Sequence, residues 1–196
     1  MKKNLIIGGV ILVLILAIGF NIKNSYNSMV SKNEAVEGAW AQVESVYQRR
    51  ADLIPNLVNT VKGYAEFEKS TFVEVTEARS KATSLTISAD ELTPENMAKF
   101  QAAQSQLSGS LSRLLATFER YPDLKANQNF LELQAQLEGT ENRISVERQK
   151  FNTIVKDYNT YIKQFPRVLY ANWFDFDKKG YFEADAGSEN APEVEF

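Results

Sequence analysis

The chain contains neither cysteine nor histidine among its 196 residues. Without cysteine it has no disulfide bond, no thiol nucleophile and no thiolate metal ligand. Without histidine it lacks the side chain that most often serves as a general base or a metal ligand. A di-iron bundle site, which combines glutamates with Glu-x-x-His motifs, cannot be built from this sequence. We therefore expect no metal site, no cofactor and no catalytic residue.

The chain also lacks a concentration of positive charge. Its net charge is -3, with 22 basic and 25 acidic residues. Residues 23–174 hold 18 basic and 18 acidic side chains, whereas residues 175–196 hold 2 basic and 7 acidic ones. Nucleic-acid binding requires a clustered basic face, so we exclude nucleic acid as a partner. No small-molecule substrate is evident from the sequence.

One long apolar run stands at the N-terminus. Residues 4–22 form 19 positions without a charged side chain. As a helix they would be about 28 Å long, close to the ~30 Å thickness of a hydrocarbon core. The alternative is a cleaved signal peptide with a small-x-small site at residues 17–19. The run is longer than a usual signal core, so we predict a transmembrane anchor over residues 1–23 in a single-pass protein of the cell membrane.

The lysines beside this run bear on its orientation. Lys2 and Lys3 precede it, and Lys23 and Lys32 follow it, so the positive-inside rule is nearly balanced. The N-terminal pair is the tighter of the two. We therefore expect the N-terminus inside the cell and the remaining domain outside the cytoplasm, in the periplasm.

Apolar residues after the anchor recur with spacings of three and four, and no alternating strand pattern is found. This periodicity predicts an all-α protein with left-handed packing of the coiled-coil type. The predicted domain is an antiparallel four-helix bundle over residues 24–166. Its predicted helices cover residues 24–51, 53–86, 94–119 and 124–165. Thr93 and Pro94 favour a helix start, and Asp123 can cap the last helix.

Pro55 lies inside the segment RRADLIPNLV at residues 49–58. A proline in mid-helix costs on the order of 3 kcal/mol. One interpretation is therefore a hairpin, in which Asp52 caps a new helix. The other is one continuous helix with a kink, which the unbroken apolar pattern favours. Length favours the hairpin, because a helix over residues 24–85 would be about 90 Å long and the later helices could not cover it.

Five polar side chains occupy positions where the apolar pattern predicts contact with the core. They are Asn33, Arg50, Gln104, Glu141 and Arg148. One hypothesis pairs Glu141 with Arg50 or Arg148 inside the bundle, where an ion pair can fix the register between helices. In the alternative, these side chains extend to water along the edges of the packed faces. Residues 138–149 are similarly interpreted as a solvated helix face, with a partner-binding face as the alternative.

Aromatic residues crowd the segment that follows the last predicted helix. They are Phe165, Tyr170, Trp173, Phe174, Phe176, Tyr181 and Phe182. Such a group can dock a partner or lie in a membrane interface. It can also fold back and cap the end of the bundle, which avoids an exposed aggregation-prone surface. We expect residues 167–183 to pack on the bundle, and we predict that residues 184–196 form an acidic disordered tail.

Several longer segments carry a resemblance to a known family. They are NEAVEGAW, RRADLIPNLVNTVKGYA, YPDLKAN, LELQAQLEGTENRI, RQKFN, VKDYN, FP and the late YFE, in this order. With them the sequence resembles the LemA family of bacterial membrane-anchored proteins, although Ala51 stands where a tyrosine is common. The resemblance implies a single N-terminal span, an antiparallel helical bundle and no known enzymatic activity. Family members are often encoded near membrane proteases or TPM-domain proteins, which implies an accessory role.

These features favour a membrane-anchored, non-catalytic scaffold or adaptor. It would hold other membrane proteins, or copies of itself, through protein–protein contacts of its bundle, and anchoring raises their effective concentration. One alternative is an envelope stress or signalling component that modulates a membrane protease. Another is an enzyme with an unrecognised site, which a deep pocket with strongly perturbed acids would support. A flat apolar or aromatic patch would support the first two hypotheses.

Overall fold

The computed structural model describes residues 2–62 and 69–184, and this part of the chain is helical without any strand. The elements are α1 (Lys2–Lys62), α2 (Lys69–Ser84), the 3₁₀ turn η1 (Ala89–Glu91), α3 (Pro94–Phe118), α4 (Pro122–Lys125), α5 (Gln128–Lys163) and α6 (Arg167–Trp173). The predicted all-α class is confirmed.

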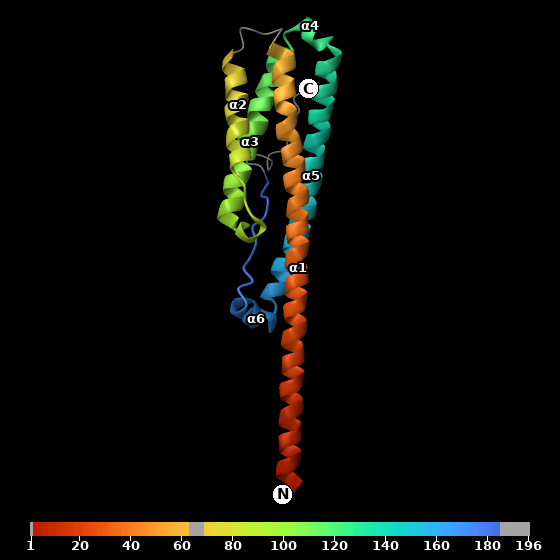
Figure 1. Cartoon of the computed structure of the whole chain (residues 1–196), viewed down its shortest axis with the longest axis vertical. Coiled ribbons are helices and arrows are strands. Elements are labelled where there is room, and N and C mark those ends of the chain that lie inside the picture. The colour runs from red at the N-terminus through yellow and green to blue at the C-terminus, as the bar shows by residue number, and fades with distance from the viewer. Residues whose placement is uncertain (1, 63–68, 185–196) are drawn as a thin grey trace, which may run out of the picture.

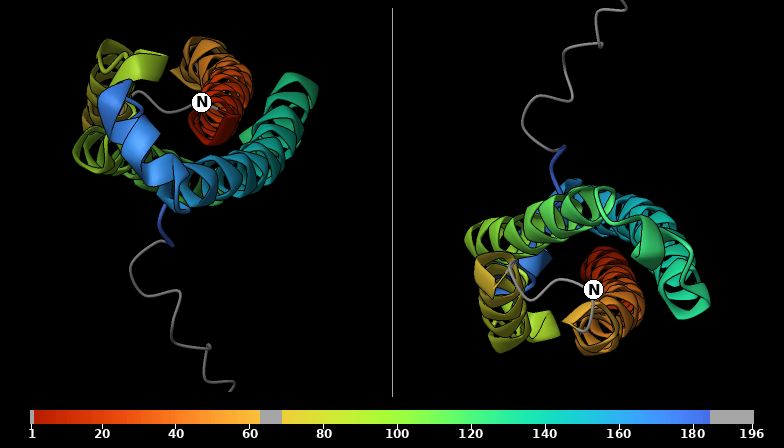
Figure 2. Two further views of the ribbon diagram at one scale, coloured as in Figure 1. Left: turned by 90° about the horizontal axis from the view of Figure 1, so that it is seen from below. Right: turned by 90° about the horizontal axis from the view of Figure 1, so that it is seen from above.

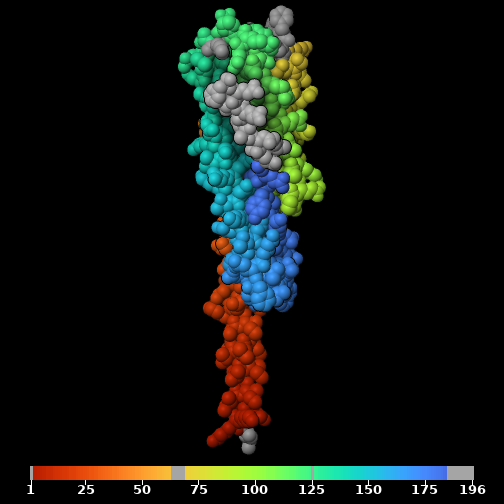
Figure 3. Space-filling model, turned by 180° about the vertical axis from the view of Figure 1, so that it is seen from behind, coloured from red at the N-terminus to blue at the C-terminus, as the bar shows by residue number. Residues whose placement is uncertain are grey.

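Four long helices form an antiparallel bundle (Figure 1). Helix α5 packs along α1, and α3 packs along α2, which also contacts α1. Viewed along the bundle, α5 curves beside α1, and α2 and α3 lie together on the other side (Figure 2). The N-terminal part of α1 extends beyond the bundle without a neighbouring helix (Figure 3).

That N-terminal part is long and apolar enough to cross a membrane. Its mean hydropathy reaches 2.8 over an 18-residue window, and none of that window is buried in the structure. Burial begins at Ser25 and Met29, where α1 enters the bundle. The exposed apolar surface therefore coincides with the predicted anchor.

The core of the bundle consists of two apolar clusters. The proximal cluster, nearer the N-terminal part of α1, includes Met29, Val36, Trp40, Tyr47, Phe100, Phe151 and Phe182. The distal cluster includes Ile54, Leu57, Phe72, Leu111, Phe118 and Leu137. Burial of a large apolar side chain contributes roughly 1.5–3 kcal/mol, so the two clusters supply most of the stabilisation. On α1 the boundary between them falls at Arg50.

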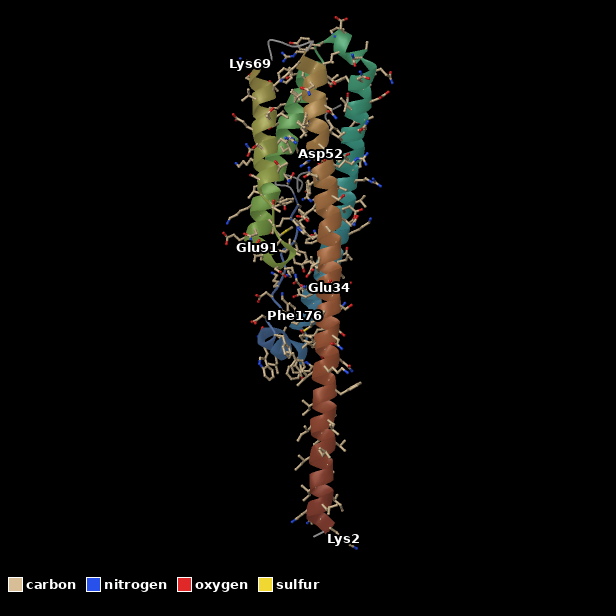
Figure 4. All side chains as sticks on the ribbon, in the orientation of Figure 1. Lys2, Glu34, Asp52, Lys69, Glu91 and Phe176 are labelled. Atoms are coloured by element: carbon tan, nitrogen blue, oxygen red, sulfur yellow. The ribbon has the colours of Figure 1, made fainter. Side chains whose placement is uncertain are left out.

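The predicted helix end near Asp52 is wrong. Helix α1 continues through Pro55 to Lys62, and α2, which begins at Lys69, runs antiparallel to it (Figure 1). Asp52 is exposed in the middle of α1, where its Oδ1 accepts a hydrogen bond of 2.8 Å from Gln48 Nε2 (Figure 4). It caps no helix.

A contact from α2 explains why α1 tolerates Pro55. Since proline has no N–H, the carbonyl of Ala51, four residues earlier, lacks its usual donor. Arg79 Nε on α2 donates to this carbonyl at 2.7 Å. The proline thus frees an acceptor on α1, and the arginine uses it to tie the two helices together.

The length that favoured a hairpin belonged to a continuous helix over residues 24–85, whereas α1 ends at Lys62. From Ser25 to Lys62 the helix is about 57 Å long. Helix α5 has 36 residues, which corresponds to about 54 Å. Because α1 ends at Lys62 and does not continue to residue 85, α5 alone matches the length of α1 inside the bundle.

The starts of α3 and α5 test the helix caps that were predicted from the sequence. Thr93 Oγ1 accepts a hydrogen bond of 3.2 Å from Asn96 N and caps α3, with Pro94 in its first turn, as predicted. The predicted helix over residues 124–165 is divided into α4 and α5. Asn127, and not Asp123, caps α5, because its Oδ1 accepts from Phe130 N at 3.1 Å. The predicted tail lies outside the described residues from position 185 onward.

Candidate functional site

A polar layer separates the two apolar clusters, and Arg50 of α1 is its centre. The residue is 1% exposed. Its Nη1 donates to Ser108 Oγ at 2.6 Å and to Glu141 Oε2 at 2.9 Å. Its Nη2 donates to Gln104 Oε1 at 2.6 Å. The guanidinium therefore links α1 to α3 and α5, while its buried Nε makes no hydrogen bond within the described part of the chain.

The ion pair in this layer is buried at one end only. The side chain of Arg50 is 2% exposed, and that of Glu141 is 54% exposed. Arg148, two turns further along α5, lies against the C-terminal segment: its Nη2 donates to Glu183 O at 3.0 Å, and its guanidinium is 4.9 Å from the Phe182 ring centroid. The structure thus brings Arg50, Gln104 and Glu141 together.

The other predicted polar residues lie elsewhere on α1. Asn33 is half-buried, and its Nδ2 donates to Glu37 Oε1 at 2.6 Å within the same helix. Asp52 is exposed on α1, and Pro55 is partly buried there, four residues after the Ala51 carbonyl to which Arg79 donates. These three residues do not join the layer around Arg50.

A cleft of about 670 Å³ opens beside the polar layer. Small side chains of α3 line one wall, namely Ala98, Ala102, Ser105 and Ser108, and Glu141 and Arg148 of α5 lie opposite. Lys178, Gly180, Tyr181 and Glu183 border its end. The described residues do not gather three acidic side chains into a group that could hold a metal ion.

The C-terminal segment, residues 175–184, follows α6 and lies on α3 and α5 without helix or strand structure. Asn159 Nδ2 donates to Lys179 O at 2.8 Å, and Lys179 N donates to Asn159 Oδ1 at 3.0 Å. Asn152 holds Phe182 in the same way, at 2.8 and 2.9 Å. Both amides bind backbone groups, so this hold is independent of the side chains in the segment.

Helix α3 holds the same segment from the other side. Gln101 Nε2 donates to Glu183 O at 2.8 Å, and Glu183 N donates to Gln101 Oε1 at 3.0 Å. We call Gln101, Asn152 and Asn159 the amide clamps. The segment also comes very close to α3, since a Cβ on Gly180 would lie 2.9 Å from Pro94 Cα.

The amide clamps were not predicted from the sequence. Asn152 and Asn159 are seven residues apart, so they lie two turns from one another on one face of α5. This spacing is the available signal. It is weak, because polar side chains on an ordinary solvated helix face repeat in the same way.

The aromatic residues after α5 divide into two groups. Phe182 is 5% exposed and lies in the proximal cluster, with Tyr170, Phe176 and Tyr181 packed against it. Trp173 is 73% exposed and Phe174 is 38% exposed. Only part of the aromatic segment therefore covers the bundle, and the rest faces outward beside α1.

Burial raises the pKa of two side chains, the buried Tyr158 and the partly buried Glu44. Burial raises the pKa of Tyr158 to about 12, the negative charge of Asp177 adds to this, and the Tyr158 hydroxyl donates to Asp177 O at 3.0 Å. Burial also raises the pKa of Glu44, which borders a small cavity of about 120 Å³. Both shifts follow from packing in the bundle, away from the walls of the larger cleft.

Comparison with known proteins shows which proteins this helical chain resembles. The model of the LemA family matches residues 39–196. The chain belongs to the LemA family. Protein LemA of Metamycoplasma hominis is 25% identical over 177 residues, which cover 89% of this LemA-family chain and 77% of the relative.

Magnetosome proteins are also similar to this LemA-family chain. Magnetosome protein MamQ of Magnetospirillum gryphiswaldense is 26% identical over 184 residues, or 83% of this chain and 66% of MamQ. Magnetosome protein MamQ 2 of Paramagnetospirillum magneticum is 24% identical over 179 residues, or 81% of this chain and 64% of the relative. The chain thus spans less than two thirds of these relatives. None of the names states an enzymatic activity.

Proposed function

We propose that the chain is a membrane-anchored, non-catalytic scaffold or adaptor that acts through protein–protein contacts of its helical bundle. The supporting observation is the way the bundle holds its own C-terminal segment. Asn152, Asn159 and Gln101 bind peptide backbone on the side where α3 faces α5. A cleft of about 670 Å³ lies directly beyond that segment.

The walls of the cleft fit a protein chain. The α3 wall of the cleft carries only small side chains, so another polypeptide backbone can approach it closely. These residues are Ala98, Ala102, Ser105 and Ser108. Glu141 and Arg148 supply charge of both signs on the other wall. Such a surface offers hydrogen bonds and contact area to another polypeptide, with other membrane proteins or a second copy as the proposed partners.

The anchor makes weak binding at this surface sufficient. Confining the bundle to a membrane raises the effective concentration of partners confined to the same membrane. The lysine distribution around residues 4–22 supports an N-terminus inside and a bundle outside the cytoplasm. The bundle would therefore meet the extracytoplasmic parts of its partners.

The experiment is crosslinking of the intact protein in its own membrane, followed by purification and mass spectrometry. Ser105→Arg fills the cleft with a long side chain, and Ser45→Arg places the same side chain on exposed α1 surface as the matched control. We expect a distinct membrane protein or a second copy to be recovered with the wild type and with Ser45→Arg. Recovery should fall several-fold with Ser105→Arg. Equal recovery with both variants would contradict the cleft as the contact surface.

A further inference from the structure

One surface of α6 is apolar and exposed. Leu169 is 57% exposed, Trp173 is 73% exposed, and Phe165 in the preceding turn is 81% exposed. Leu169 and Trp173 are four residues apart, so they lie on one face of α6, and Phe165 is exposed in the turn that precedes the helix. The other face packs on the bundle, where Ala171 is 2% exposed. A contiguous apolar patch that the fold itself does not use marks an interaction site.

This patch lies at the end of the bundle from which α1 emerges (Figures 1 and 4). Contacts with Tyr26 show at which height along α1 the patch lies. The ring centroid of Tyr26 is 5.0 Å from that of Phe174 and 5.8 Å from that of Phe176. Tyr26 is four residues beyond Ile22, where the uncharged run ends. Four residues of helix correspond to about 6 Å along the axis.

That distance matches the headgroup layer of a bilayer. The polar layers add roughly 5–7 Å on each side of a hydrocarbon core of about 30 Å. If residues 4–22 span the core, α6 lies at headgroup depth. Tryptophan and other aromatic side chains prefer this depth, and an apolar helix face can lie in its plane.

We propose that the apolar face of α6 docks into the headgroup layer of the membrane that α1 enters, and that it forms a second attachment of the bundle. The proposal rests on anchoring by residues 4–22. Trp173 stacks on Phe174 with centroids 5.8 Å apart and ring planes 13° apart, which forms a broad rigid surface. Residues 163–178 carry Lys163, Arg167 and Lys178 against Asp175 and Asp177, a net charge of only +1, so apolar contact holds α6 in the membrane without a requirement for anionic lipid.

A second attachment has a consequence for the cleft. One helix entering a membrane leaves the bundle free to tilt, whereas a docked α6 holds the bundle upright. Arg50 is 28 residues beyond Ile22, which places the polar layer and its cleft roughly 40 Å above the end of the span. The cleft would then meet partner domains at a fixed height above the membrane.

Tryptophan fluorescence tests the proposal directly. The chain has two tryptophans, and Trp40 is 2% exposed inside the bundle. The full-length protein is reconstituted into phosphatidylcholine vesicles whose acyl chains are brominated near the carbonyl end. We expect strong quenching of wild-type emission and almost none in Trp173→Phe, because Trp40 is about 27 Å beyond the span.

Two further variants keep the reporter and test the docking face. Leu169→Glu places a charge on the apolar face of α6, and Leu131→Glu does so at the far end of α5, where Leu131 is 45% exposed. We expect quenching of Trp173 to fall several-fold in Leu169→Glu and to stay unchanged in Leu131→Glu. Adding anionic phosphatidylglycerol should not change these results.

Extraction at alkaline pH first establishes that each protein is anchored, which separates a failed anchor from a failed docking. Anchored protein whose Trp173 is unquenched by brominated lipid but quenched by iodide would overturn the proposal, because α6 would then face water. Shielding of Trp173 from both quenchers would also overturn it, because the face would then be covered by a second copy of the chain.

Discussion

The ion pair between Arg50 and Glu141 offers the sharpest test of how the bundle is held together. Glu141→Gln keeps the shape of the side chain and removes the charged acceptor of Arg50 Nη1. The guanidinium keeps Gln104 Oε1, Gln104 O, Ser108 Oγ and the Tyr47 ring as partners, and all of these are neutral. The variant therefore leaves a buried cation with weaker compensation.

The exposure of the two side chains sets the expected magnitude. Exposed ion pairs contribute roughly 0.2–1 kcal/mol, and breaking a fully buried pair costs about 3–5 kcal/mol. Here one side chain is 2% exposed and the other 54%. Hydrogen bonds to charged groups contribute about 1.5–3 kcal/mol, so we expect Glu141→Gln to lower the free energy of unfolding by about 2 kcal/mol. This corresponds to a fall in Tm of roughly 4–8 °C.

The assay is thermal and urea unfolding of the full-length protein in detergent, followed by circular dichroism. A double-mutant cycle with Arg50→Met isolates the pairwise term, for which we also expect about 2 kcal/mol. Glu138→Gln is the control, because Glu138 is exposed and accepts only within α5 from Gln134 Nε2 at 3.0 Å. It should cost less than about 0.5 kcal/mol. A coupling energy near zero would refute the conclusion that the pair links α1 to α5.

Three further predictions follow from single contacts. Because unfolded chains lose the Tyr158 proton near pH 10 and folded chains near the raised pKa of about 12, the free energy of unfolding should fall by about 1.4 kcal/mol per pH unit between these values. Denaturant unfolding should show that this fall is absent in Tyr158→Phe. Pro55→Ala restores a backbone N–H that can donate to Ala51 O, the carbonyl that Arg79 binds. Arg79→Ala should therefore lower the free energy of unfolding by about 1 kcal/mol in the wild type and by clearly less in the Pro55→Ala background. Equal losses in both backgrounds, measured by denaturant unfolding, would contradict this exchange of donors. Gly180→Ala should lower the free energy of unfolding by roughly 1–3 kcal/mol through overpacking against α3, and it should make residues 175–184 more sensitive to proteolysis. Gly139→Ala is the control, because a Cβ there has nothing within 4 Å, and it should change neither property.

Local pattern was sufficient for the class of fold and for some helix ends. The three-and-four spacing predicted helices, and Thr93 with Pro94 predicted the start of α3, because these signals act within a few residues. Pro55 shows where local pattern fails. The estimated cost of the proline left out the hydrogen bond that Arg79 donates to Ala51 O, and these two residues are 28 positions apart.

The candidate site depended even more on distant contacts. The sequence pointed to Arg50 and Glu141 as polar residues in apolar positions and left the partner of Glu141 open. The two residues are separated by 91 positions, and no local rule selects between such partners. The amide clamps Gln101, Asn152 and Asn159 were missed for the same reason. In the sequence, an amide that binds a distant backbone segment looks the same as an amide exposed to solvent.

The sequence by itself determined an all-helical chain with one apolar run long enough to span a membrane, and its lack of cysteine and histidine excluded thiol and imidazole chemistry. These properties depend on composition and on spacing within a few turns of helix. Only the tertiary structure decided that α1 continues through Pro55, that Arg50 meets Glu141, and that the apolar face of α6 lies about one helical turn beyond the end of the apolar run. Each of these depends on which distant surfaces bury one another, and that is settled by the packing of the whole bundle.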